Sequence, residues 1–88
     1  MSRQKYYISD DCVAEMLGEE MIVLNLSTGQ YHELDSIGIL IWEEIKKSNL
    51  NFNQLLKNLR PKFNNSVIEQ ELNEFIENLL NRGIIIKK

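Results

Sequence analysis

The part of the sequence that most constrains the fold lies at residues 21–34, where two strand-like stretches flank a tight turn. Residues 21–26, Met-Ile-Val-Leu-Asn-Leu, contain the β-branched and aliphatic side chains that favour a buried strand. The Thr28-Gly29 pair favours a hairpin, because glycine readily takes the positive φ of a tight turn. We therefore expect Gln30–Leu34 to be the last strand of a small antiparallel sheet.

We hypothesise that this last strand binds a second peptide. An outermost strand leaves a row of backbone N–H and C=O groups unpaired, and an extended peptide can dock there as an added strand. Alternation places Tyr31 and Glu33 on one face of the strand and His32 and Leu34 on the other. The sequence leaves open which face meets the helices. A proline at His32 would test strand addition if the N–H of that residue points outward.

An arm and one more strand are expected before the hairpin. Residues 12–17 alternate loosely and predict the first strand of the sheet, followed by a Gly-Glu-Glu turn at 18–20. Residues 1–11 are polar apart from Tyr6, Tyr7 and Ile8. We expect them to form a partly extended arm that packs its tyrosines onto the sheet.

Three helices are expected after the hairpin. Asp35 is a good N-cap for the first helix, and Gly38 inside it indicates a close approach of the backbone to the sheet. Asn51 and Gln54 form a variant capping box for the second helix, which Pro61 ends. The third helix begins with a Ser-Val-Ile-Glu capping box at residues 66–69 and ends before Gly83.

The third helix has an apolar stripe with a widened flank. The core stripe is expected to consist of Ile68, Leu72, Phe75 and Leu79. Ile76 and Leu80 widen it, and the sequence leaves open whether they are core or line a pocket. A short strand is predicted at residues 84–86, Ile-Ile-Ile. The fold class is therefore α+β and winged-helix-like: a three-stranded antiparallel sheet followed by three helices and a short C-terminal strand.

Size and composition favour one domain over residues 1–88. The net charge of −3 argues against a general binder of nucleic-acid phosphates, which needs a basic surface. The single cysteine excludes an internal disulfide and suits a reducing cytoplasm. Neither a signal peptide nor an apolar run long enough to cross a membrane is present in the sequence, so we expect a cytoplasmic protein with no membrane partner.

The sequence lacks the motifs of common catalytic and metal sites. His32 and Cys12 are the only histidine and cysteine, too few for a zinc site of the usual four-ligand kind. There is no glycine-rich phosphate loop, and adjacent carboxylates such as Glu19-Glu20 are typical of a solvated surface. We expect no catalytic residue, no metal and no cofactor, and hence a protein that is not an enzyme.

Residues 24–35, Leu-Asn-Leu-Ser-Thr-Gly-Gln-Tyr-His-Glu-Leu-Asp, followed by Gly38 and Ile41-Trp42, resemble the PqqD-like family. This family comprises the leader-recognition domains, or RiPP recognition elements, of ribosomally made and post-translationally modified peptides. Its pattern is a hydrophobic residue, Asn-x-x-Thr-Gly-x-aromatic-x-x-Leu-Asn, then Gly, then Ile-Trp. The chain departs from it at Asp35, where the family often has asparagine.

The resemblance implies a winged-helix-like domain in which a precursor's leader peptide adds as a strand to the third strand. The leader would lie in a groove between that strand and the third helix. The small size resembles the free-standing leader-binding protein of lasso-peptide biosynthesis, which works with a separate leader peptidase. Similar domains serve radical-SAM peptide modifiers, including the PQQ pathway, and these remain an alternative.

The residues expected to contact the peptide lie on this strand and this helix: Gln30, Tyr31, His32, Glu33, Leu34, Glu69, Leu72, Asn73, Ile76 and Leu80. A winged-helix DNA-binding regulator is the alternative from another functional class. Against it, the third helix carries Glu69, Glu71, Glu74 and Glu77, with Arg82 as its basic residue. Such a helix would repel the phosphates that flank a major groove.

Overall fold

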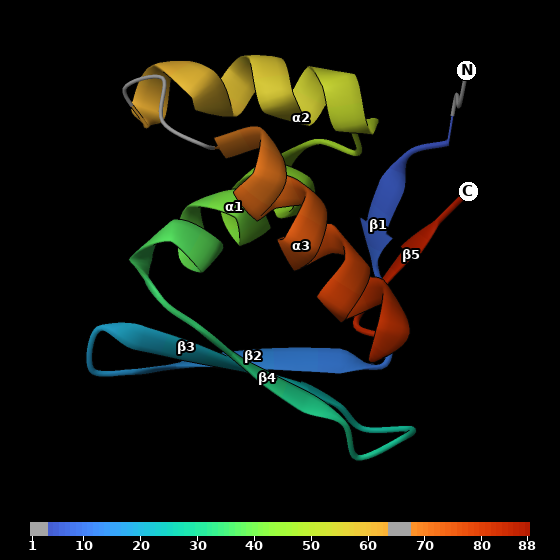
Figure 1. Ribbon diagram of the computed structural model, residues 1–88. Coiled ribbons are helices and arrows are strands. Elements are labelled where there is room, and N and C mark those ends of the chain that lie inside the picture. Colours follow the sequence, from blue (N-terminus) through green and yellow to red (C-terminus); the bar gives the residue numbers. More distant parts are fainter. Residues whose placement is uncertain (1–3, 64–67) are drawn as a thin grey trace.

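The computed structural model describes residues 4–63 and 68–88, which form two small sheets and three helices joined by short connections (Figure 1). In chain order the elements are β1 (Tyr6–Ile8), β2 (Cys12–Leu17), β3 (Glu20–Asn25), β4 (Tyr31–Leu34), α1 (Ser36–Lys47), α2 (Phe52–Leu59), the 3₁₀ helix η1 (Arg60–Lys62), α3 (Ile68–Asn81) and β5 (Ile85–Lys87). The helices lie on one side of the sheet formed by β2, β3 and β4. The predicted α+β class is confirmed.

The sheet β2–β3–β4 is an antiparallel meander with β3 in the middle. Gly29 takes a φ of 76° in the turn between β3 and β4, as the predicted hairpin requires. Val23 lies opposite His32, and Met21 lies opposite Leu34. Met21, Val23 and Leu34 are buried, so this is the face that meets the helices. The alternation predicted for β4 is confirmed, and the structure decides which face points inward.

The helix starts follow the capping signals of the sequence. The side chain of Asp35 accepts a hydrogen bond from the backbone N–H of Gly38 at 2.9 Å and caps α1. Asn51 and Gln54 form the predicted reciprocal capping box of α2. The helix α2 ends at Leu59 and continues as η1. The capping box predicted at residues 66–69 begins within residues 64–67, which lie outside the described residues.

The core lies between the inner face of the sheet and the three helices. Its buried apolar residues are Met21, Val23, Leu34, Ile41, Trp42, Ile45, Leu55, Leu56, Leu59, Leu72, Ile76, Leu79, Ile84 and Ile85. These side chains come from β3, β4, all three helices and the C-terminal segment, so one continuous cluster holds the elements together.

The N-terminal arm differs from its prediction. Instead of packing onto the meander, β1 pairs antiparallel with β5 in a separate two-stranded sheet, with Tyr7 opposite Ile86. The N–H of Ser9 donates to the carbonyl of Ile84 at 3.0 Å, which extends this pairing. The two segments lie side by side next to the C-terminal end of α3 (Figure 1). The two ends of the described chain therefore stabilise each other.

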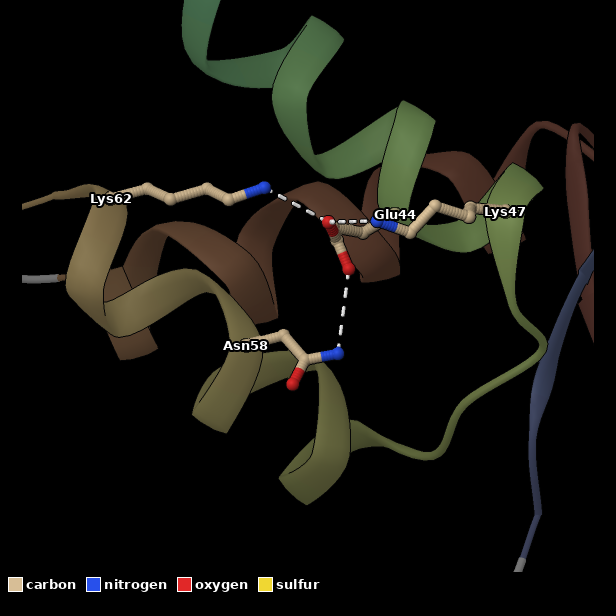
Figure 2. Close-up of polar contacts among 4 residues, drawn as sticks. All are labelled: Glu44, Lys47, Asn58 and Lys62. Carbon is tan, nitrogen blue, oxygen red and sulfur yellow. Dashed lines mark hydrogen bonds and ion pairs between the residues drawn. The ribbon is translucent and has the colours of Figure 1, made fainter.

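A buried carboxylate fastens α1 to the segment that follows it. The side chain of Glu44 is 6% exposed and accepts hydrogen bonds from Lys62 at 3.0 Å and from Asn58 at 3.4 Å (Figure 2). Lys47 lies 3.8 Å from the same carboxylate. The hydrogen bond from Lys62 is the main reason that the pKa of Glu44 lies below its usual range. This cluster holds α2 and η1 against α1.

Candidate functional site

The outer edge of β4 presents backbone groups that no strand of the described chain pairs. The N–H of Asn25 donates to the carbonyl of Gln30 at 2.8 Å, so the backbone of Gln30 points toward β3. Pairing alternates along an antiparallel ladder, so His32 also points its backbone groups toward β3. The N–H and C=O groups of Tyr31 and Glu33 therefore point away from the sheet. These are the groups that an added strand would use.

A cavity of about 290 Å³ lies beside this edge, between β4, the start of α1 and α3. Its lining residues come from all three elements and from the start of β3: Glu20, His32, Glu33, Leu34, Asp35, Ile37, Gly38, Ile41, Glu71, Glu74, Phe75 and Asn78. The floor is apolar and the walls are acidic. We call this cavity the β4 groove.

Gly38 allows the elements around the β4 groove to approach one another. A Cβ atom at this position would lie 3.2 Å from the ring of Phe75 on α3 and 3.3 Å from Cβ of Leu34 on β4. Both distances are shorter than most Cβ contacts, so a side chain here would push α1 away from its neighbours. The close approach predicted for Gly38 is confirmed, and it involves α3 as well as the sheet.

The start of β4 is held by the amide of Asn25, which is buried. Its Nδ2 donates to the carbonyl of Gly83 at 2.8 Å. Its Oδ1 accepts hydrogen bonds from the backbone N–H groups of Ser27 at 2.8 Å and Thr28 at 3.2 Å. One side chain thus joins the hairpin to the turn after α3. This is the physical role of the asparagine in the Asn-x-x-Thr-Gly sequence.

Arg82 reaches the outer edge of β4 from the end of α3. Its Nη1 donates to the carbonyl of Tyr31 at 3.1 Å, which agrees with an outward direction of this carbonyl. Burial, and secondly the positive charge of Arg82, lower the pKa of His32 below its usual value. A neutral imidazole is therefore favoured next to the groove.

The strand residues predicted for peptide contact lie at this edge, but the helix residues do not line the groove. Tyr31 and Glu33 are exposed, His32 is half-buried and Leu34 is buried. On α3, the predicted residues were Glu69, Leu72, Asn73, Ile76 and Leu80, and none of them is among the described residues that line the cavity. Leu72 and Ile76 belong to the core, and Ile76 is only 2% exposed.

The helix residues that line the groove are Glu71, Glu74, Phe75 and Asn78. They occupy the opposite flank of the apolar stripe. Phe75, which was predicted to belong to the core stripe, is half-buried and borders the groove. Periodicity identifies the stripe but cannot tell which of its flanks borders the strand.

A second cavity of about 460 Å³ lies between the N-terminal segment, the start of β2 and α1. Trp42, Lys46 and Cys12 contribute to its lining. The thiol of Cys12 is half-buried and donates to the carbonyl of Ile84 at 3.5 Å. Burial raises the pKa of this thiol, so it is not an activated nucleophile.

Metal binding and membrane insertion each require a recognisable arrangement of side chains. Within residues 4–63 and 68–88, no group of three or more histidine, cysteine, aspartate or glutamate side chains is arranged to hold a metal ion. Across the same ranges, no helix is both long and apolar enough to cross a membrane.

The sequence matches a known family, and the fold resembles a solved structure. A family model described as coenzyme PQQ synthesis protein D (PqqD) matches residues 20–85. The solved structure of TbiB1 in complex with the TbiA(beta) leader peptide is similar, with a TM-score of 0.77 and 25% sequence identity over 90% of this chain and 93% of that chain. No curated protein sequence gives a significant match.

Proposed function

Because the chain belongs to the family of coenzyme PQQ synthesis protein D, we propose that it binds the leader segment of a ribosomally synthesised precursor peptide. The leader adds as a strand to the outer edge of β4 and lies in the β4 groove beside α3. The observation that carries this proposal is the pair of outward-facing residues, Tyr31 and Glu33, next to a cavity between the strand and a helix.

Strand addition suits a protein that must bind a peptide without modifying it. Backbone hydrogen bonds supply affinity, and side-chain pockets supply specificity. The protein is then a presenting element, and the chemistry belongs to a partner enzyme. We favour a leader peptidase of lasso-peptide biosynthesis as this partner. The likeness to TbiB1, which was solved with a leader peptide, supports leader binding, and a pull-down tests the choice of partner.

Two other functions are weaker candidates. A role as a peptide chaperone for a radical-SAM enzyme differs only in the partner, and a pull-down with each class of enzyme separates the two. DNA binding through α3 is opposed by its charge, because Glu69, Glu74 and Glu77 are exposed on this helix. A random duplex should accordingly give no salt-dependent shift.

Fluorescence anisotropy tests the proposal. The probe is a labelled leader peptide from a precursor encoded beside this gene, and the controls are the scrambled leader and the unlabelled core peptide. We expect a dissociation constant roughly between nanomolar and micromolar, or about −12 to −8 kcal/mol, and loss of binding on scrambling. Equal affinity for the scrambled peptide, or no affinity for any neighbouring leader, would contradict leader recognition.

A further inference from the structure

The two ends of the outer edge of β4 carry opposite charges. At the Tyr31 end, the guanidinium of Arg82 lies on the strand edge. At the Asp35 end, the groove is walled by carboxylates, and no lysine or arginine is among the described residues that line it. The acidic lining residues are Glu20, Glu33, Asp35, Glu71 and Glu74.

Among residues 4–63 and 68–88, no lysine or arginine forms an ion pair with the acidic wall. Where the structure describes the chain, the ion pairs of lysine and arginine are made with Glu44 and Glu69, which lie outside the groove. The carboxylate of Glu74 accepts a hydrogen bond from the neutral amide of Gln70 at 3.4 Å. The charge of the wall is therefore available to a ligand.

A single added strand is long enough to reach both Arg82 at one end of β4 and the carboxylates at the other end. Successive residues of a strand advance about 3.3 Å, so the four residues of β4 span roughly 10 Å between the first and the last. Side chains of an added strand alternate between the two faces of the sheet, so those that point toward α3 are two residues apart. A peptide docked on β4 can thus place one side chain near Arg82 and another over Glu71 and Glu74.

Resting on the proposed function, we infer that the bound leader segment carries an acidic side chain beside Arg82 and a basic side chain two or four residues away, over Glu71 and Glu74. The carboxylate forms a charge-assisted hydrogen bond with the guanidinium. The basic group meets the carboxylates of the groove wall. A leader that docks in the same direction with the reverse order of charges meets like charges at both ends, which weakens its binding.

Arg82 can bind a leader carboxylate while it keeps its hydrogen bond to the carbonyl of Tyr31. A carbonyl oxygen has two lone pairs, so the carbonyl of Tyr31 can accept from the guanidinium and from a leader N–H together. A guanidinium has five N–H donors, and the bond to Tyr31 uses one that lies on Nη1. The remaining donors can bind a leader carboxylate. In the free protein the same arginine keeps one edge carbonyl satisfied.

Selection from a random peptide library, displayed on phage, tests the charge pattern and does not require the leader sequence. The protein is used in parallel as wild type, as Arg82→Glu and as Arg60→Glu. The Arg60→Glu variant is a matched control, because this exposed arginine contacts Glu69 at the other end of α3. Selected peptides are then synthesised, and their affinities for all three proteins and for Glu33→Pro are measured by anisotropy.

The inference predicts that peptides selected on wild type share an acidic and a basic residue two or four positions apart. Arg82→Glu should weaken their binding about tenfold, and a lysine in place of the acidic residue should restore it. Arg60→Glu should leave it unchanged. Peptides that bind β4, as judged by their loss on Glu33→Pro, but are indifferent to Arg82→Glu would overturn the inference alone. No selected peptide, or peptides indifferent to Glu33→Pro, would overturn the proposed function as well.

Discussion

The sheet has two open edges, and only one of them has the features of a peptide site. On the β4 side, the edge is four residues long and is bordered by the groove with its acidic wall and by Arg82. On the β2 side, five of the six residues are exposed, including Val13 at 51%, Met16 at 49% and Leu17 at 56%. The larger cavity of about 460 Å³ also lies on the β2 side, beside Trp42 of α1.

The comparison of the β4 and β2 edges shows that neither an unpaired edge nor the size of a cavity identifies the docking strand. Both edges offer backbone hydrogen bonds. Both edges also have apolar side chains beside them, but the cavity at β4 is lined by the carboxylates of Glu71 and Glu74 from α3, whereas Lys46 is the charged side chain that α1 contributes beside β2. Specificity in strand addition comes from such side chains, so β4 is the edge that can discriminate between peptides.

The largest effect is expected from a charge placed on the core side of α3. Ile76→Glu buries a carboxylate at a position that is 2% exposed and should lower the free energy of unfolding by about 3–5 kcal/mol. Asn73→Glu, on an exposed position of the same helix, should change it little. Urea denaturation measures both. A stable Ile76→Glu variant that had lost only peptide binding would move the peptide site to this flank of α3, away from the β4 groove.

A proline on each edge compares the two strands directly. Glu33→Pro removes an outward N–H from β4 and should weaken leader binding roughly thirtyfold, through one lost hydrogen bond and a distorted edge. The pairing register places Met16 with its N–H outward on β2, so Met16→Pro is the matched control and should bind normally. Anisotropy gives both affinities, and the opposite ranking would assign the leader to β2.

A large side chain placed in each cavity tests which of the two cavities the leader peptide occupies. Asn78→Trp places a large side chain in the β4 groove, and Ala14→Trp does the same in the cavity beside β2. Both positions are exposed, so the fold should tolerate either change. We expect about a tenfold loss of leader affinity for Asn78→Trp and almost none for Ala14→Trp. A larger loss for Ala14→Trp would mean that the peptide reaches the other cavity.

A smaller effect, remote from both edges, is expected at Glu44. Glu44→Gln should lower the free energy of unfolding by about 1 kcal/mol at neutral pH and leave leader affinity unchanged. The pKa of Glu44 is lowered in the folded state, so its contribution is present above the ordinary value of 4.5 and is lost as the pH falls through the folded pKa. The difference between the two proteins should therefore shrink in acid. A difference that stays constant with pH would contradict the charged network of Figure 2.

The smallest effect concerns His32. Its pKa is lowered from 6.5 in the folded protein, so the unfolded chain takes up the proton first as the pH falls. Stability should decline below pH 6.5, and His32→Gln should remove this part of the decline. NMR titration of the imidazole gives the pKa directly, and Arg82→Gln should raise it. An unshifted histidine in the wild-type protein would contradict the burial of the imidazole, and an unchanged pKa in Arg82→Gln would contradict the proximity of Arg82.

The sequence predicts those parts of the fold that are determined by local signals. Gly29 fixes the hairpin, Asp35 caps α1, and Asn51 with Gln54 caps α2, because each acts on backbone groups only a few residues away. The alternation of β4 is likewise local. These signals place the strand that carries the proposed site.

Features that depend on long-range packing could not be predicted in this way. The pairing of β1 with β5 joins Tyr6 to Lys87, and three-residue strands give almost no periodic signal. The rotation of α3 about its axis decides whether Glu71 or Asn73 borders the groove, and the apolar stripe is compatible with both. The hydrogen-bonding phase of β4 follows from the closure of the hairpin, so the outward amide is that of Glu33 and not that of His32.

Amide hydrogen exchange, measured by NMR with and without bound leader peptide, tests the central proposal most directly. Addition of a strand to β4 should slow exchange at the N–H groups of Tyr31 and Glu33, which face outward in the free protein. Those of Ala14 and Met16, which face outward on β2, should keep their rates. Protection at Ala14 and Met16 with unchanged exchange at Tyr31 and Glu33 would contradict leader recognition at β4.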